Sequence, residues 1–143
     1  MATHDSATTD RTLRCVVVTP ERAVLDETVD FVALPMYDGE LGVLPGRAPL
    51  IGRLGYGELR LLRGNRTEHY FVDGGFVQVR ANVVTVLTQK AIVAAELKPQ
   101  EAQEQLSAAL ATPAKSPEAQ SSRQQAEDRA RAQLHLARKL HQP

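Results

Sequence analysis

The chain has 143 residues, enough for one ordinary domain with a small appendage but not for two full hydrophobic cores. Its 17 Lys and Arg residues balance its 17 Asp and Glu residues, so no overall charge indicates nucleic acid or an anionic membrane as partner. The single cysteine, Cys15, excludes an internal disulfide and a cysteine-built zinc site.

No stretch of about 18 uncharged apolar residues occurs, so we expect a soluble protein that only another molecule could hold at a membrane. Residues 1–11 are small and polar, which predicts a disordered leader. We expect a β-sandwich domain over residues 12–95 and a helical hairpin over residues 96–143.

The first domain consists of short segments rich in β-branched residues and separated by turn residues. This pattern predicts a sandwich of about ten short antiparallel strands. The predicted strands are Leu13–Thr19, Ala23–Val29, Phe31–Met36, Gly57–Arg63, Thr67–Val72, Phe76–Arg80, Val83–Thr88 and Ala91–Val93.

Between the third and fourth of these strands, the segment Asp38–Leu50 contains three glycines and two prolines among core-sized apolar residues. Glycine adopts left-handed backbone angles and proline lacks an N–H donor, so the segment predicts a strand interrupted by tight corners.

Three further turns are expected. Gly64-Asn65 is typical of a two-residue hairpin turn because both residues tolerate positive φ, and Ala81-Asn82 separates another pair of strands. Asp73-Gly74-Gly75 lacks the following helix and the Lys-Ser/Thr pair of a phosphate loop, so we expect a turn between strands there.

After Ala95 the composition changes to Ala, Gln, Glu and Leu, which favour helix. Pro99 suits the first turn of one helix, and Thr112-Pro113 ends it. Ser116-Pro117-Glu118 begins a second helix, which runs to about Leu140. The short connection predicts an antiparallel hairpin.

Few large apolar side chains are available to hold this hairpin together. They are Leu106, Leu110, Leu134, Leu136 and Leu140. Each contributes about 1.5–3 kcal/mol if fully buried, whereas fixing the backbone costs about 1–2 kcal/mol per residue. We therefore expect the hairpin to dock on something or to change shape readily.

The sequence contains no convincing active site. The four histidines lack metal-ligand spacing, and Cys15 is expected to be a small core or edge residue rather than a nucleophile. Asp38 and Glu40 flank one glycine and could act as acid and base, but solvated carboxylates or a docking contact are the simpler interpretations. We expect no catalytic residue, no cofactor and no metal.

One stretch of the second helix is unevenly charged. Its basic residues outnumber Glu127 and Asp128, which is typical of a solvated face but also of a site for an acidic partner. The basic residues are Arg123, Arg129, Arg131, Arg138 and Lys139.

The segment GELGVLPGRAPL, with Gly39, Gly42, Pro45 and Pro49, resembles the loop signature of the epsilon subunit of F-type ATP synthase. The resemblance continues, in the same order, through the stretches 57–60, 72–79 and 82–87 into the helical tail. It implies a non-catalytic rotor subunit with partners in the gamma subunit, the c-ring and the alpha/beta head. It also implies peripheral attachment, through the complex, to the cytoplasmic side of a bacterial inner membrane.

The resemblance also implies contact residues. Glu40, Leu41, Gly42 and Arg47 would contact the c-ring, although a histidine is common where Arg47 stands. The hairpin would extend into the catalytic head and restrain ATP hydrolysis. Its residues facing an acidic segment of the beta subunit would be Arg123, Arg129, Arg131 and Arg138.

Some members of this family bind ATP through an Ile/Leu-Asp-x-x-Arg-Ala sequence. Here Leu97–Ala102 has Lys98 in place of the aspartate and Glu101 in place of the arginine, so we expect little or no binding of ATP by the chain itself. From the residues alone, a free-standing β-sandwich ligand-binding module with a helical oligomerisation tail is the alternative, followed by an enzyme using Cys15, Asp38 or Glu40.

Overall fold

The computed structural model describes residues 11–141 and divides the chain into two compact units. The sheet unit ends at Ala91 and the helical unit begins at Ile92, and each is described here by itself. Apart from Arg11, the leader predicted for residues 1–11 lies outside the described residues.

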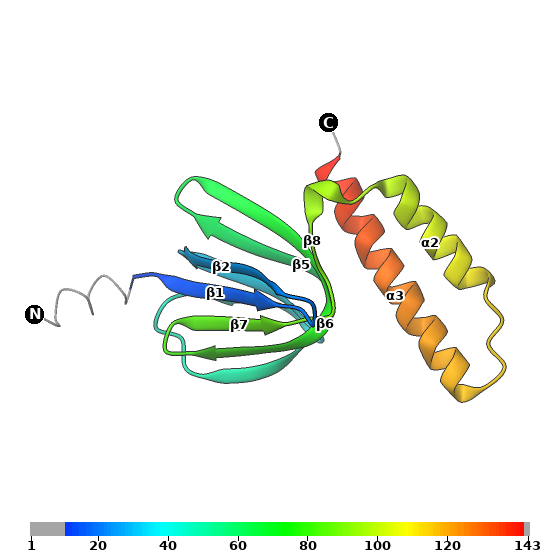
Figure 1. Cartoon of the computed structure of the whole chain (residues 1–143), viewed down its shortest axis with the longest axis horizontal. Coiled ribbons are helices and arrows are strands. Elements are labelled where there is room, and N and C mark those ends of the chain that lie inside the picture. The colour runs from blue at the N-terminus through cyan, green and yellow to red at the C-terminus, as the bar shows by residue number, and fades with distance from the viewer. Residues whose placement is uncertain (1–10, 142–143) are drawn as a thin grey trace, which may run out of the picture. The chain divides into compact units, whose positions relative to one another are not determined.

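The order of elements follows the predicted change from short strands to helices (Figure 1). The strands are β1 (Leu13–Val18), β2 (Ala23–Val29), β3 (Phe31–Met36), β4 (Gly39–Val43), β5 (Leu50–Arg63), β6 (Arg66–Arg80), β7 (Val83–Leu87) and β8 (Ala91–Val93). The helices are the 3₁₀ turn η1 (Ala94–Glu96), α2 (Pro99–Ala111) and α3 (Pro117–Leu140).

The predicted β-sandwich followed by a helical hairpin is confirmed, but the strands differ in detail from the expectation. The sheet order is β2-β1-β7-β6-β5-β3-β4. β1 pairs parallel with β7, whereas an entirely antiparallel sandwich was predicted. The described residues form eight strands rather than about ten, because β5 and β6 are long.

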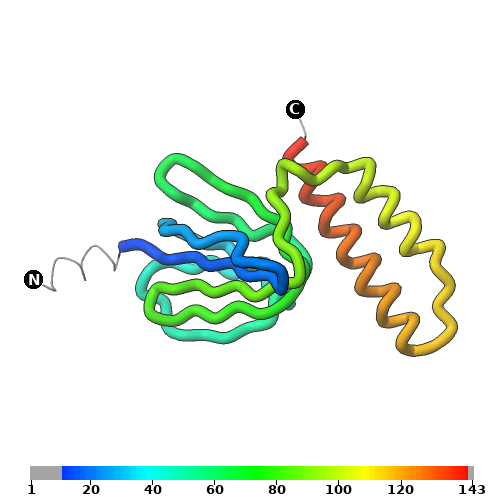
Figure 2. The backbone as a smooth tube through the Cα atoms, in the orientation of Figure 1, coloured from blue at the N-terminus to red at the C-terminus, as the bar shows by residue number. Residues whose placement is uncertain are grey.

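β5 and β6 are long because each contributes to both layers of the sandwich. They pair with each other from Leu50 opposite Val79 to Arg63 opposite Arg66. Along β6, β7 pairs only with the second half, while β3 pairs with the second half of β5 and reaches the first half only where Met36 lies opposite Leu54. The two strands therefore bend together from one layer into the other, as the backbone trace in Figure 2 shows.

Glycines allow this bend. Gly74 and Gly75 lie inside β6 with φ of 65° and 109°, so the expected turn between two strands at Asp73-Gly74-Gly75 is wrong. A Cβ at Gly75 would lie 1.9 Å from the Leu87 carbonyl oxygen, and one at Gly57 in β5 would lie 2.9 Å from Pro35. Positive φ and close backbone approach both require glycine at Gly75.

The core fills the space between the two layers. Its buried residues are all Val and Leu except Cys15. Cys15 is completely buried within it, as expected for a small core residue.

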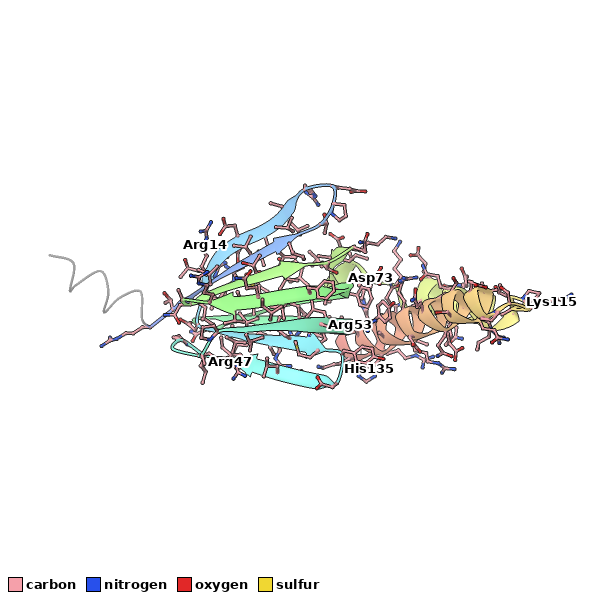
Figure 3. The ribbon with its side chains drawn as sticks, turned by 90° about the horizontal axis from the view of Figure 1, so that it is seen from below. Arg14, Arg47, Arg53, Asp73, Lys115 and His135 are labelled. Atoms are coloured by element: carbon pink, nitrogen blue, oxygen red, sulfur yellow. The ribbon has the colours of Figure 1, made fainter. Side chains whose placement is uncertain are left out.

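Four connections gather at the end of the sandwich opposite the bend, which we call the loop end. It contains Asp30, which connects β2 to β3, the loop of residues 44–49, and the turns Gly64-Asn65 and Ala81-Asn82. Both two-residue turns are present where predicted, with φ of 61° at Gly64, 50° at Ala81 and 62° at Asn82, but Asn65 does not adopt positive φ. In Figure 3, Arg47 lies at the loop end and Arg53 lies near the bend.

The helical unit is an antiparallel hairpin whose ends agree with the predicted signals. Thr112 has extended angles, φ −72° and ψ 125°, and ends α2 before Pro113. Ser116 caps α3, because its Oγ accepts the Ala119 N–H over 3.1 Å. Lys115 lies at the turn of the hairpin (Figure 3).

The hairpin core is small. Two alanines and two leucines make up its buried cluster: Ala102, Leu106, Ala130 and Leu134. Leu110, which we expected to contribute, is 43% exposed. The hairpin is thus held by even fewer large side chains than the sequence suggests.

Candidate functional site

Three residues of the c-ring contact expected from the resemblance, Glu40, Leu41 and Gly42, lie on β4. β4 is the last strand in the sheet order, so one side of its backbone has no neighbouring strand among the described residues. Unpaired edge strands offer backbone donors and acceptors to other chains. The geometry therefore makes this strand available for contact with another subunit.

The three residues differ in accessibility. Leu41 pairs with Leu34 and is partly buried against the core, so it is the least suited to a contact. Gly42 is exposed, but a Cβ there would lie 2.9 Å from the Phe31 ring, and packing alone accounts for a glycine at this position. Glu40 is exposed and directed away from the core.

Glu40 belongs to a chain of charged groups across β4, β5 and β6. Its Oε1 accepts from Arg60 over 3.4 Å, and Arg60 also donates to Glu58 Oε1 over 3.4 Å. Glu58 Oε2 lies 2.7 Å from His69 Nδ1. The sequence reasoning missed this network, although the alternation of Glu58 and Arg60 in a predicted strand was a signal that both face outward.

Arg47 lies in the loop after β4 and is exposed at the loop end. Within residues 11–141 its guanidinium has no hydrogen-bonding or ion-pairing partner. Leu44, in the same loop, is 61% exposed. The Gly46 N–H donates to Asn82 Oδ1 over 2.8 Å, which joins this loop to the turn between β6 and β7. This loop therefore exposes an apolar side chain, Leu44, and a basic side chain, Arg47.

A second surface, which the sequence did not reveal, is the outer face of the layer formed by β1, β7, β6 and the first half of β5. Ile51, Phe76 and Leu87 are 78%, 57% and 52% exposed. Phe76 is directly opposite Leu87, which is directly opposite Val18. We call Ile51, Phe76 and Leu87 the apolar face.

A hollow of about 340 Å³ lies at Phe76 and Leu87, bounded on one side by Val18. The signal for this surface was present in the alternation of β6, where Val77 and Val79 are buried and Phe76 therefore faces outward. Large exposed apolar side chains on neighbouring strands are typical of protein–protein contacts.

The four arginines expected to face the beta subunit do not lie on one face of α3. Arg123 donates to the Leu110 carbonyl over 3.0 Å and so satisfies a carbonyl at the end of α2. Arg129 and Arg131 are two residues apart, about 200° around the helix axis, so they project to different sides.

Arg131 and Arg138 are seven residues apart and do share a face. With Lys139 and His135 they surround a hollow of about 430 Å³ on the hairpin, whose apolar lining is Leu106 and Leu134. Arg131 also pairs with Glu127 at 2.9 Å, which partly offsets its charge. This basic hollow is suited to carboxylate groups.

The stretch Leu97–Ala102, which stands where some family members have an ATP-binding sequence, leads into α2. Lys98 Nζ lies 3.8 Å from Glu101 Oε1, so the two exchanged charges form an ion pair with each other. The prediction that ATP binds poorly remains a prediction.

The residues considered for catalysis have no arrangement that supports it. Burial, with smaller contributions from Glu27 and Asp26, raises the pKa of the Cys15 thiol to about 12, so it stays protonated at neutral pH. Asp38 is exposed in the turn between β3 and β4. Within residues 11–141, no three His, Cys, Asp or Glu side chains gather as metal ligands would.

Among residues 11–141, no helix combines the length and apolar character needed to span a bilayer.

A family model described as "ATP synthase, Delta/Epsilon chain, beta-sandwich domain" matches residues 12–94. A relative from Rhodopirellula baltica named "ATP synthase epsilon chain" is 56% identical over 126 residues, which cover 88% of this chain and 98% of the relative. Another of that name, from Pelotomaculum thermopropionicum, is 47% identical over 88 residues, or 62% of this chain and 66% of the relative. A third, from Nitratidesulfovibrio vulgaris, is 44% identical over 82 residues and matches along only 61% of its own length.

Solved structures resemble both parts of the chain. A chain in the Euglena gracilis mitochondrial ATP synthase, described as OSCP/F1/c-ring in rotational state 1, is 25% identical with a TM-score of 0.76, covering 92% of this chain and 82% of that chain. A chain in the central stalk/c-ring of Tetrahymena thermophila mitochondrial ATP synthase has a TM-score of 0.70 at 13% identity, covering 87% and 96%. The second likeness shows the fold alone.

Proposed function

The chain belongs to the family of ATP synthase delta/epsilon chains, and from this membership we propose that it is the epsilon subunit in the central stalk of an F-type ATP synthase. Epsilon chains are accessory subunits without an active site. The observation that carries the proposal is the 56% identity to an epsilon chain along 98% of that relative. The alternative, a free-standing ligand-binding module, has no comparable support.

We infer that the apolar face binds the gamma subunit. Its side chains Ile51, Phe76 and Leu87 are among the most exposed large apolar residues of the sheet unit, and they lie on neighbouring strands. Burying such side chains against a partner contributes about 25 cal/mol per Å² of apolar surface, and aromatic side chains frequently dominate interfaces. The rigid sheet beneath them needs no rearrangement on binding.

Copurification tests this contact with a matched pair of variants. Phe76→Ser removes an aromatic ring from the apolar face, while Leu44→Ser removes an exposed apolar side chain at the loop end. We expect Phe76→Ser to reduce recovery of a gamma subunit with the tagged chain at least tenfold, and Leu44→Ser to leave it nearly unchanged. Equal recovery with both variants would refute the assignment of this face.

The c-ring contact is proposed for the β4 edge and the loop that follows, through Glu40 and Arg47. Both are exposed charged residues, one acidic and one basic, on a strand with an open edge and its loop. Leu41 and Gly42 have structural explanations, so we assign them the smaller part of this contact. Mutating Arg47 to Ala should lower the ion pumping obtained per ATP hydrolysed in the reconstituted complex.

The alpha/beta head is the proposed partner of the hairpin. Arg131 and Arg138 beside the basic hollow are the strongest candidates for an acidic segment of the beta subunit. Arg131 and Arg138 also donate to Glu127 and Gln103, but they line the hollow, whereas Arg123 and Arg129 do not. Raising the salt concentration should weaken a contact of this kind, because exposed charges are screened.

The proposed location follows from these partners. The chain would be attached peripherally, through the rest of the complex, to the cytoplasmic side of a bacterial inner membrane. It would need no nucleic acid, cofactor or metal for this role.

A further inference from the structure

The loop carrying Arg47 is tied to a distant part of the sheet by the side chain of Asn82. The Gly46 N–H donates to Asn82 Oδ1 over 2.8 Å, although the two residues are far apart in sequence. Gly46 immediately precedes Arg47, so this hydrogen bond fixes the backbone at the point where the basic side chain leaves it.

The geometry of the loop explains why this N–H is available. Pro45 and Gly46 form the centre of a turn, with φ of 85° at Gly46, which is the pattern of a type II turn. In a type II turn the N–H of the third residue, here Gly46, takes no part in the turn's own hydrogen bond. Asn82 supplies the acceptor that the turn itself cannot.

Asn82 is in turn held by the sheet. Its backbone is left-handed, with φ of 62°, which asparagine tolerates better than most residues. Its own carbonyl accepts the Arg14 N–H over 2.9 Å, which anchors the turn to β1. The side chain of Asn82 therefore extends to the loop from a fixed base.

We propose that Asn82 is a positioning residue for the c-ring contact: it holds the loop of residues 44–49 in the shape that presents Arg47. The inference rests on the contact proposed for Arg47 in the preceding subsection. An ordered loop loses less conformational entropy on binding, so loss of the hydrogen bond weakens the contact without removing any group that touches the partner.

Two substitutions separate the hydrogen bond from the backbone conformation. Asn82→Gly keeps the left-handed backbone but removes the acceptor, and Asn82→Asp keeps both. Asn65→Gly is the control, because Asn65 lies in the other two-residue turn of the loop end.

Amide exchange of Gly46, followed by NMR on the full chain, tests the hydrogen bond. We expect exchange to be about two- to tenfold faster in Asn82→Gly, the range that one net hydrogen bond gives, and near the wild-type rate in Asn82→Asp and Asn65→Gly. Unchanged exchange in Asn82→Gly would overturn the inference.

Ion pumping per ATP hydrolysed, measured on the reconstituted complex, tests the positioning. We expect the ratio to fall in Asn82→Gly and in Arg47→Ala, and to be restored in Asn82→Asp. If only Arg47→Ala lowers it, the contact stands and the positioning role of Asn82 is refuted. If neither lowers it, the proposed contact itself fails and the inference fails with it.

Discussion

Leu134→Ala tests whether the helical hairpin opens independently of the sandwich. Leu134 is 6% exposed and belongs to the cluster formed with Leu106, Ala102 and Ala130. Truncating a buried leucine costs about 2–5 kcal/mol, because the transfer free energy is lost and a cavity remains. Here the cost falls on a cluster with only one other large side chain.

The measurement is hydrogen exchange of α2 and α3 followed by mass spectrometry. A loss of about 2–5 kcal/mol corresponds to exchange about 30- to several-thousandfold faster, up to the limit set by the hairpin's own opening free energy. Leu110→Ala is the matched control, since Leu110 is 43% exposed and its truncation should cost about 1 kcal/mol or less.

Two results would contradict this reasoning. Equal acceleration by Leu134→Ala and Leu110→Ala would show that the small cluster does not hold the hairpin together. Acceleration of the strands β1 to β7 by the same factor as the helices would show that the two units unfold as one.

Four other outcomes are expected. Gly75→Ala should destabilise the sandwich by more than about 3 kcal/mol in thermal or denaturant unfolding, because the new Cβ would lie 1.9 Å from the Leu87 carbonyl oxygen and the residue has φ of 109°. Near-wild-type stability would show that β6 does not bend there. Iodoacetamide should label Cys15 only after unfolding, because burial and a thiol pKa of about 12 keep Cys15 inaccessible and protonated at pH 8. Rapid labelling of the folded chain, detected by mass spectrometry, would contradict this. Truncation after Glu96 should leave a folded sandwich that still binds a gamma subunit, with ATP hydrolysis by the complex unchanged or faster, and slower hydrolysis would argue against an inhibitory tail. Titration of the full chain with ATP should show no saturable binding, and a saturable calorimetric signal would overturn the prediction made from Lys98 and Glu101.

The helix boundaries were predictable because their signals are local. Pro99 and Ser116-Pro117 begin α2 and α3, and Thr112-Pro113 ends α2, as read from the sequence. These residues act on backbone groups within one turn of helix, so no tertiary information is needed. The turns Gly64-Asn65 and Ala81-Asn82 were predictable for the same reason.

The candidate contact residues were only partly predictable. The resemblance suggested Glu40, Leu41 and Gly42 as a group, but the pairing of β4 with β3 turns Leu41 inward and leaves Glu40 outward. The ion pair of Glu40 with Arg60 joins residues twenty positions apart, which no local pattern reveals. The apolar face likewise depends on Phe76 meeting Leu87 across two strands.

By itself, the sequence determined the alternation of buried and exposed residues, the turns, the two helices and, through its linked motifs, the family. Only the tertiary structure decided that β5 and β6 each run through both layers, that β1 lies parallel to β7, and which side chains meet on a surface. The physical reason is range: caps and turns depend on the residues beside them, whereas Gly75 bends β6 against a carbonyl twelve residues away. Register and layer assignment come from burial of the whole core, which distant segments form together.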